Sequence, residues 1–322
     1  MPAPLVHPFP FDPTHGYSAD DLLRVGSPEP PDDFEAFWRH RHDVALAVDP
    51  RPALSGARVD AAHPGWQVLD IEYRSTGGFH IGGWLMLPRD EPVERGLVVG
   101  HGYGGREGPD FGLPVSRTAV LFPCFRGLSR STRPPISRDP NWHVLHDIDK
   151  RDRYILGGCV DDLWIAVSVM LALYPWVAGH VAYCGTSFGG GIGALAIPWD
   201  PRIVRGHLEV PTFGNHPLRL TLDATGSSAA VRKFQRRHED VLDTLRYYDA
   251  ATAARFITVP MHVAPALFDP AVPPAGQFAI HNAIPGDRKK LFTLDAGHFE
   301  YPGQADQELA LRRELEDFLA GS

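Results

Sequence analysis

Residues 185–189, with the sequence GTSFG, fit the pattern G-x-S-x-G, in which a serine stands on a tight turn between a strand and a helix. An apolar run at 180–184 precedes the turn, and a run of small residues follows it. The two glycines leave room where a side chain would collide with neighbouring backbone, and the turn lifts the serine hydroxyl above the sheet. Ser187 is therefore the candidate nucleophile, and a serine that caps a buried helix is the alternative.

A serine hydroxyl is a weak nucleophile at neutral pH, so it needs a base and a group that orients the base, in the chain order Ser, Asp or Glu, His. Asp269 follows an apolar run at 261–267, and His298 follows one at 290–294. Both residues would lie at the carboxyl ends of strands, where the loops of an open α/β sheet converge. We therefore predict that Asp269 and His298 complete a catalytic triad with Ser187. A solvated turn aspartate and a surface histidine are the respective alternatives.

The glycine-rich loop HGYGG at residues 101–105 follows a short apolar run at 97–99. Its glycines allow a backbone amide to face the reaction centre. Acyl transfer places negative charge on one oxygen, and each donor to that oxygen is worth about 3 kcal/mol. We predict that the amides of Tyr103 and Phe188 form this oxyanion hole, with an ordinary glycine turn as the alternative for Tyr103.

These residues need a scaffold in which apolar strands alternate with helices. Two β-rich runs on either side of Gly77 and Gly78 predict an antiparallel hairpin, and the later strands are followed by loops that contain glycine or proline. The predicted fold is α/β, of the α/β-hydrolase type, with a mostly parallel central sheet, an antiparallel N-terminal hairpin and helices on both faces. The predicted strands are 66–73, 80–87, 97–99, 118–122, 180–184, one ending at Val210, 261–267 and 290–294. The predicted helices are 32–48, 159–173, much of the polar segment 221–255, one near Gln277 and one at the C-terminus.

Composition argues against several classes of function. The chain has 322 residues and a formal charge of −8, which opposes binding to nucleic acid or to an anionic membrane. Three cysteines without CxxC spacing favour a reducing cytoplasm, and the opening residues lack the pattern of a signal peptide. The uncharged stretch 163–199 exceeds the length of a membrane span, but prolines and glycines divide it into short pieces typical of buried core elements. We expect residues 1–30 to form an extended arm and residues 31–322 a single domain.

From about Pro31 to the C-terminus the chain resembles the acetyl xylan esterase / cephalosporin C deacetylase family of α/β-hydrolases. The matching stretches are PDDF at 31–34 with FW at 37–38, GGWL at 82–85, HGYGGR at 101–106, RG at 126–127, the turn at 185–189, LRYYD at 245–249, and the loop from Asp269 through VPP at 272–274. The resemblance places Ser187, Asp269 and His298 on the family's triad, and Tyr103 and Phe188 on its oxyanion-hole positions. It implies removal of acetyl groups from small acylated sugars or related alcohols, in a homo-oligomer that is commonly a hexamer. The predicted reaction needs no metal and no organic cofactor.

The sequence departs from the family pattern at three places. Leu128 stands where the family has the glutamine of an Arg-Gly-Gln triplet, Phe188 replaces a usual glutamine, and Phe299 separates His298 from Glu300. None of these changes alters a reacting group, because a backbone amide donates whatever its side chain. We expect an apolar pocket around Phe188, which bears on the acyl and alcohol preference. Arg126 is expected to support the active-site loops, and Phe213 to line the acyl pocket or else to be an ordinary core residue.

Other interpretations use some of the same residues. The run GGGIGA at 189–194, with Glu209 downstream, is a loose dinucleotide-binding pattern, but such a pattern should begin immediately after the strand, and here Thr186, Ser187 and Phe188 intervene. A peptidase, a lipase-like carboxylesterase and a non-catalytic binding protein on the same fold are further alternatives. The rival acids for the triad are Asp287 and Asp295, and the raw material for a metal site, which lacks an HExxH motif, is His40, His42, His143, His146, Asp147 and Asp149.

Overall fold

The structure is a computed structural model that describes residues 5–321. Its strands are β1 (Ala53–Val59), β2 (Trp66–Ser75), β3 (Phe79–Pro88), β4 (Arg95–Gly100), β5 (Thr118–Pro123), β6 (Val181–Thr186), β7 (Ile203–Glu209), β8 (Met261–Ala264) and β9 (Lys289–Leu291). Within the described range these nine strands form one sheet in the order β1-β2-β3-β5-β4-β6-β7-β8-β9. The pairs from β1 to β5 are antiparallel, and those from β5 through β4 to β9 are parallel.

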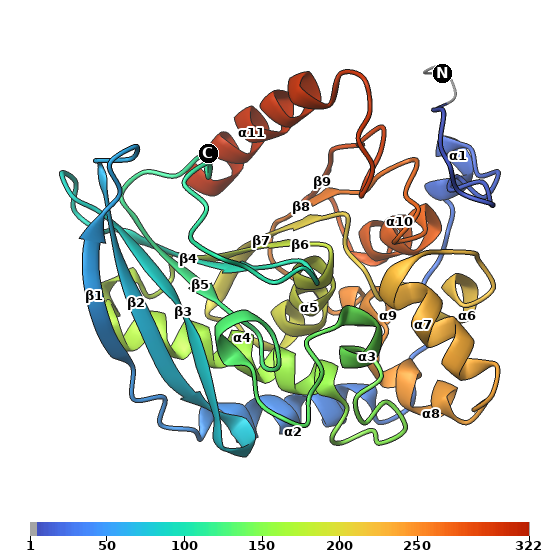
Figure 1. Ribbon diagram of the computed structural model, residues 1–322, viewed down its shortest axis with the longest axis horizontal. Coiled ribbons are helices and arrows are strands. Elements are labelled where there is room, and N and C mark those ends of the chain that lie inside the picture. The colour runs from blue at the N-terminus through green and yellow to red at the C-terminus, as the bar shows by residue number, and fades with distance from the viewer. Residues whose placement is uncertain (1–4, 322) are drawn as a thin grey trace.

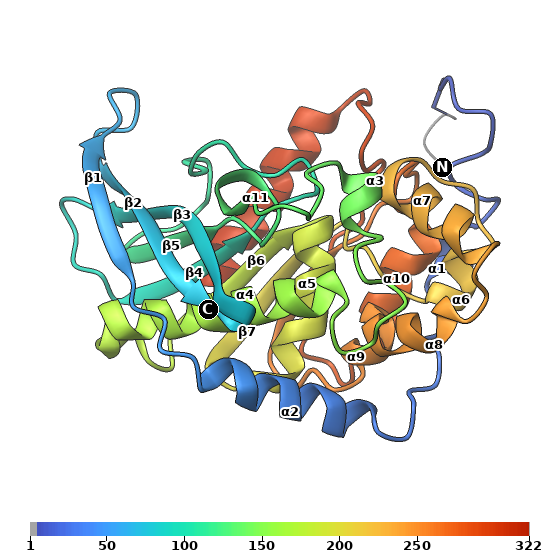
Figure 2. The same cartoon turned by 60° about the horizontal axis from the view of Figure 1, so that its bottom comes forward.

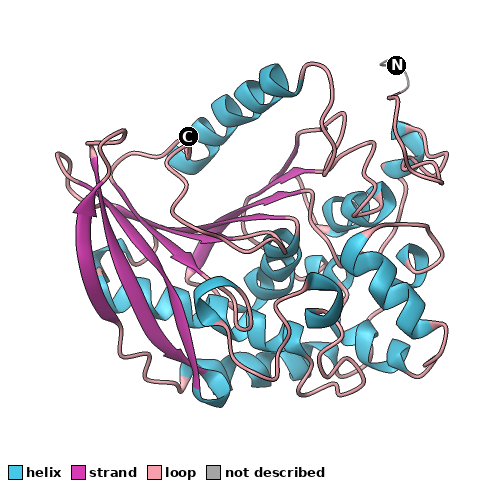
Figure 3. Ribbon diagram, in the orientation of Figure 1, coloured by secondary structure: helices cyan, strands magenta, loops and turns pink. Residues whose placement is uncertain are grey.

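Helices cover both faces of this sheet (Figure 1, Figure 3). The helices are α1 (Ala19–Leu22), α2 (Phe34–Leu46), α3 (Pro140–His143), α4 (Ile155–Leu173), α5 (Phe188–Ala196), α6 (His216–Arg219), α7 (Gly226–Gln235), α8 (Val241–Leu245), α9 (Ala250–Ala254), α10 (Pro274–Ala283) and α11 (Gln304–Ala320). α4 and α5 pack on one face, and Figure 2 shows α2 along the outer side of that layer. On the other face, Phe318 and Leu319 of α11 join the cluster that contains Trp84 and Leu97. The predicted α/β-hydrolase architecture is confirmed.

The uncharged stretch 163–199 is divided in the structure into α4, β6 and α5. Among the helices of residues 5–321, α4 is the one that is long and apolar enough to cross a membrane. Most of its residues are buried, however, and Trp164 is 0% exposed and donates its indole N–H to the carbonyl of Ala196 at 3.0 Å. The apolar composition of α4 is therefore explained by its position in the core.

Several elements differ from the sequence-based expectation; β8, for example, ends at Ala264, whereas the predicted strand continues to 267. β1 was not predicted, because every residue in it is exposed and its sequence ALSGARV shows no buried face. The segment 221–255 is broken into α7, α8 and α9. Asp249 marks the start of α9, which it caps by accepting hydrogen bonds from the backbone N–H groups of Ala251 and Thr252. β9 is shorter than the predicted strand and continues only as an isolated bridge between Ala266 and Leu294.

The predicted N-terminal arm lies beside the loops that follow β8 and β9, and its first four residues are outside the described range. It is not extended throughout, because Ser18 caps the short helix α1. His7 packs against Phe268, with ring centroids 5.3 Å apart, and Phe9 packs against Phe299 at 5.8 Å. The side-chain amide of Asn282 on α10 donates to carbonyls of the arm. The arm thus contacts residues adjacent to Asp269 and His298.

The strand order creates a crevice at the carboxyl ends of β4 and β6. The chain leaves β4 towards β5 on one side and leaves β6 towards β7 on the other, so the loops that follow the two strands diverge. Such a topological switch point is where open α/β sheets bind their ligands. The loop with Tyr103 follows β4 and Ser187 follows β6, so both predicted elements meet here.

Candidate active site

Ser187 occupies a strained turn between β6 and α5. Its φ of 55° and ψ of −110° lie outside the regions that side chains normally adopt. The flanking glycines are required sterically, because a Cβ on Gly185 would lie 2.5 Å from the carbonyl oxygen of Gly189, and one on Gly189 would lie 2.7 Å from the carbonyl carbon of Gly100. The backbone N–H of Ser187 donates to the carbonyl of Glu209 at 2.8 Å, which fixes the turn to β7.

The three predicted triad side chains meet although they are far apart in the sequence. His298 Nε2 lies 2.8 Å from Ser187 Oγ, and His298 Nδ1 lies 2.7 Å from Asp269 Oδ2. A carboxylate only accepts hydrogen bonds, so Nδ1 carries the proton and Nε2 is free to accept from the serine hydroxyl. The geometry is that of a nucleophile, a base and a group that orients the base.

Asp269 is fully buried, and its two carboxylate oxygens have different hydrogen-bond partners. Oδ1 accepts from the backbone N–H groups of Ala271 and Val272, both at 2.8 Å. Oδ2 faces His298 and also accepts from the side-chain amide of Gln277 at 2.9 Å. Gln277 is itself fixed, because its carbonyl oxygen accepts from the N–H of Ala266. Sequence reasoning placed a helix near Gln277 but did not reveal this contact, which no local motif encodes.

His298 is a stronger base than an ordinary histidine. Burial lowers the pKa of its imidazole, but the charge of Asp269, the hydrogen bond to Asp269 and the charge of Glu209 together raise that pKa above 6.5. The side chain remains 28% exposed, so it is accessible from the crevice.

The loop with Tyr103 lies directly against Ser187. The carbonyl of His101 accepts from the N–H of Gly189 at 2.9 Å, and a Cβ on Gly102 would lie 3.9 Å from Cβ of Ser187. Phe188 begins α5, where the first N–H groups have no partner within the helix. Both predicted oxyanion donors therefore belong to backbone beside the nucleophile.

The side chains of these two residues form part of an aromatic cluster. The Phe188 ring stacks on Tyr103, with centroids 4.1 Å apart, and is 0% exposed. Phe213 meets Phe188 edge to face at 6.0 Å and is 1% exposed. Phe213 therefore packs in the core behind Phe188, and its predicted contact with an acyl group stays a prediction.

Two buried histidines, His101 and His143, connect the loops behind the site. Since a carbonyl can only accept, His143 donates from Nε2 to the carbonyl of Arg126 at 2.9 Å, and its Nδ1 lies 3.3 Å from the hydroxyl of Tyr103. His101 accepts from the N–H of Phe125 at 3.0 Å. Burial lowers the pKa of each imidazole to about 4, so both are neutral near pH 7.

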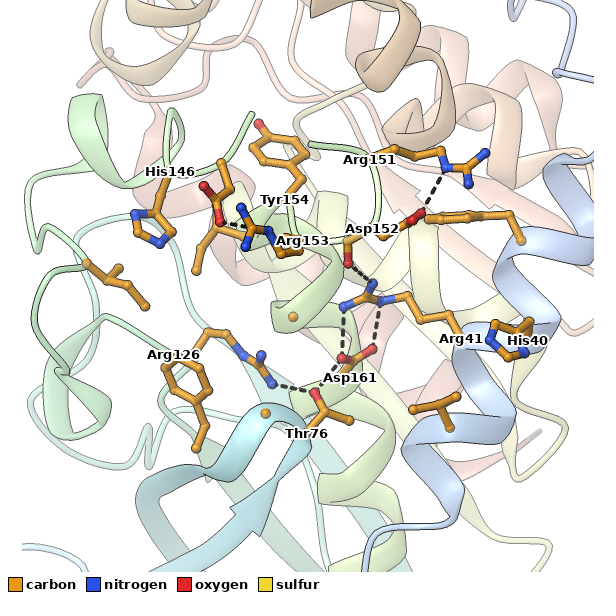
Figure 4. Close-up of a pocket in the computed structure, with 18 of the residues that line it drawn as sticks. His40, Arg41, Thr76, Arg126, His146, Arg151, Asp152, Arg153, Tyr154 and Asp161 are labelled. Carbon is orange, nitrogen blue, oxygen red and sulfur yellow. Dashed lines mark hydrogen bonds and ion pairs between the residues drawn. The ribbon is translucent and has the colours of Figure 1, made fainter. Parts of the chain in front are cut away.

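Arg126 lies in a buried network that holds the loop after β5. Its guanidinium pairs with Asp162 of α4 at 2.6 Å and also donates to Ser75 and Thr76 at the end of β2. Figure 4 shows Arg126 and Asp161 on either side of Thr76, at the wall of a cavity of about 770 Å³ between α2 and α4. None of the triad residues lines this cavity. The contacts of Arg126 are structural, and none reaches Ser187.

The other candidate residues do not converge. Within residues 5–321, no group of three or more His, Cys, Asp or Glu side chains is placed to hold a metal ion. His42 contacts Trp164, and Asp147 pairs with Lys150. The glycine run at 189–194 lies inside α5 and is buried throughout. Neither rival acid, Asp287 or Asp295, occupies the position that Asp269 takes beside His298.

The fold, the strained serine turn and the Ser-His-Asp geometry define an α/β-hydrolase. The model of the acetyl xylan esterase (AXE1) family matches residues 22–312, and the chain belongs to that family. The acetyl esterase Axe7A of Xylanibacter ruminicola is 24% identical over 153 residues, which are 48% of this chain and 35% of that protein. The chain thus spans about a third of the length of this relative.

Two solved structures share the fold over nearly their whole length. The acetyl xylan esterase from Paenibacillus sp. R4 matches with a TM-score of 0.80 and 22% identity, over 92% of this chain and 99% of that one. Acetyl xylan esterase 1 from Thermoanaerobacterium sp. JW/SL YS485 matches with a TM-score of 0.77 and 20% identity, over 95% and 99% of the two chains.

Proposed function

We propose that the protein is a serine esterase that removes acetyl and other small acyl groups from acylated sugars or related small alcohols. The observation that carries the proposal is the continuous chain of contacts from Ser187 Oγ through His298 to Asp269, at 2.8 and 2.7 Å. Membership of the acetyl xylan esterase family supports an ester, rather than a peptide or a long-chain lipid, as the substrate. The predicted roles of the three triad residues and of the two oxyanion-hole residues, Tyr103 and Phe188, are part of this proposal.

In the first half-reaction, His298 Nε2 takes the proton of Ser187 while Oγ forms a bond to the carbonyl carbon of the ester. The carbonyl oxygen becomes negative and accepts from the backbone N–H groups of Tyr103 and Phe188. The bond to the alcohol oxygen then breaks, and the alcohol leaves with the proton that His298 held. Asp269 keeps His298 in the required tautomer and stabilises its cation.

In the second half-reaction, a water molecule replaces the alcohol. His298 takes a proton from the water as its oxygen attacks the acyl carbon, and the same two amides hold the oxyanion. Collapse releases the carboxylic acid and returns the proton to Ser187. No step requires a metal or an organic cofactor.

Replacement of the nucleophile tests the proposal directly. We expect Ser187→Ala to abolish hydrolysis of p-nitrophenyl acetate, because no other group can form the acyl-enzyme, while circular dichroism and the melting temperature stay close to wild type. A variant that retains the wild-type rate would overturn the assignment. A series of esters should be hydrolysed fastest at acetate, and a preference for butyrate or longer chains would favour the lipase-like alternative.

Three finer properties are also proposed. The resemblance to the family supports a homo-oligomer, with a hexamer as the expected form, and light scattering after size-exclusion chromatography would measure its mass. The cysteine content supports a cytoplasmic location. Cephalosporin C is a candidate substrate beside acetylated xylan oligomers, and release of acetate from each would separate them.

A further inference from the structure

Glu209 is attached to the nucleophile turn by both its backbone and its side chain. It ends β7, opposite Thr186 at the end of β6 in the parallel ladder. The hydroxyl of Thr186 donates to Glu209 Oε2 at 3.0 Å, and the N–H of Ser187 donates to the carbonyl of Glu209 at 2.8 Å. The carboxylate of Glu209 is therefore held beside the turn that carries Thr186 and Ser187.

The loop that carries His298 packs against the same end of β7. A Cβ on Gly297 would lie 2.8 Å from Cγ1 of Val210 and 2.6 Å from Oδ2 of Asp269, so this loop fits closely between the ends of β7 and β8. Across this contact the charges of Glu209 and His298 interact, and each favours the charged form of the other. The loop of His298 thus packs against the ends of two neighbouring strands, β7 with Glu209 and β8, which Asp269 follows.

In the part of the chain that the structure describes, no cation pairs with Glu209. Within residues 5–321 it takes part in no ion pair, and its only side-chain hydrogen bond that the structure shows is the one from Thr186. Burial raises its pKa, and the nearby acids Glu308 of α11 and Asp110 raise it further. Arg106 lines the same cavity as Glu209, about 280 Å³ in volume, but its guanidinium stacks over Phe122 at 4.7 Å. Glu209 is partly buried, and a partly buried carboxylate without a counter-ion is stabilised when a positive charge appears nearby.

We propose that Glu209 is a positioning residue for the reaction, a second carboxylate that stabilises the His298 imidazolium when Ser187 transfers its proton. Asp269 orients the ring through a hydrogen bond, whereas Glu209 acts on the ring through its charge. The positive charge that forms on His298 in each half-reaction is the partner that Glu209 lacks in the resting enzyme. This inference rests on the proposed esterase function.

The test is the variant Glu209→Gln, which keeps the shape and the acceptor for Thr186 but removes the charge. The other ionisable groups around His298 and Glu209 include Asp269, Asp110, Glu308, Asp295, Tyr301, Cys184 and Arg106, and they are unchanged. We expect the acid limb of the kcat/KM profile to move to lower pH by roughly half a unit to one unit, because His298 loses a charge that favours its protonated form. At the plateau, kcat should fall about three- to tenfold, since the imidazolium is less stable.

Two control variants separate this effect from a general disturbance. Glu308→Gln removes the same charge from an exposed residue whose charge acts on Glu209, and it should leave the acid limb in place. Glu209→Asp retains the charge, and it should restore most of the acid limb to its wild-type position. An acid limb that is unmoved in Glu209→Gln, whatever the value of kcat, would overturn the proposal.

A measurement that does not depend on turnover keeps the inference distinct from the proposed function. The imidazole signal of His298, identified in an NMR spectrum by its absence from His298→Gln, is titrated in the wild type and in Glu209→Gln. A lower midpoint in Glu209→Gln supports the role of Glu209, and equal midpoints refute it. If the wild type does not hydrolyse p-nitrophenyl acetate, the esterase proposal fails, while this titration still decides whether Glu209 acts on His298.

Discussion

At the scale of single residues, the hydrogen bonds of Asp269 determine which tautomer His298 can adopt. Oδ1 accepts from two backbone N–H groups, so an asparagine at this position must keep its oxygen on that side. Its NH2 group would then face His298 Nδ1, which would have to accept and would leave the proton on Nε2. A histidine in that tautomer cannot take the proton of Ser187.

We therefore expect Asp269→Asn to lower kcat for p-nitrophenyl acetate by about 10⁴-fold, the loss seen for the corresponding change in chymotrypsin-like enzymes, with little change in fold. Asp295→Asn is the matched control, since Asp295 is the rival acid on the loop of His298, and its kcat should stay close to wild type. Steady-state kinetics on the two variants check this. A large loss in Asp295→Asn with little loss in Asp269→Asn would reverse the assignment of the acid.

The sequence was sufficient to predict that Ser187, Asp269 and His298 come together, because each follows an apolar run and the ends of parallel strands meet at one edge. It was insufficient for Gln277 and Glu209, whose roles depend on contacts with residues distant in the chain. Gln277 lies on α10 and meets Asp269 across a turn, and Glu209 lies near the loop of His298 because Gly297 of that loop packs against Val210 at the end of β7. Such partners have no signal in spacing or residue type.

At the scale of elements, the loop after β5 depends on one buried ion pair. Arg126 and Asp162 are 7% and 0% exposed in their side chains, and Arg126 also stacks over Phe79 at 4.5 Å. Burial lowers the pKa of Arg126, but the charge and hydrogen bonds of Asp162 outweigh it, so the guanidinium stays charged. Loss of one member would leave an uncompensated charge in the core.

We expect Arg126→Met to lower the free energy of unfolding by about 3–5 kcal/mol, as measured by urea denaturation. Arg130→Met is a close control, because Arg130 also stacks over an aromatic ring, Trp84 at 4.1 Å, and pairs with an aspartate, Asp70 at 2.8 Å. Its pair is partly exposed to solvent, so the loss should be below about 1 kcal/mol. Equal effects in the two variants would show that burial of the Arg126 pair is unimportant.

Elements with a buried face were the ones that the sequence predicted well. β6, α4 and α5 are almost wholly buried, and their apolar runs identified them. β1 has no buried residue and is held by pairing with β2, so hydrophobic patterning could not reveal it. The start of α9 also depends on a tertiary contact, because Asp249, which caps this helix, accepts a hydrogen bond from the backbone N–H of His216.

At the scale of the whole molecule, burial favours the neutral form of several histidines. His101 and His143 stand behind the site, His207 of β7 contacts His262 of β8 at 3.1 Å, and His216 begins α6. Burial lowers the pKa to about 4 for the first two and to about 3 for His207 and His216, where His262 and Arg219 respectively add repulsion. In the unfolded chain each of these groups titrates near 6.5.

The sign of the pH dependence follows from these pKa values. Between about pH 4 and 6.5 the unfolded chain binds more protons than the folded one, so the free energy of unfolding rises with pH in that window. The contribution of each histidine is complete above about pH 6.5 and is lost as the pH falls, by about 1.4 kcal/mol per pH unit.

His216→Phe replaces one titrating ring by an apolar ring of similar size in a buried position next to Phe213. We expect urea denaturation between about pH 5 and 7.5 to give a shallower pH dependence for this variant, by roughly one proton, even if its stability at pH 7 is lower because the hydrogen bond to the carbonyl of Tyr248 is lost. Curves that differ only by a constant offset would show that His216 binds the same number of protons in the folded and unfolded states, and hence that burial does not lower its pKa.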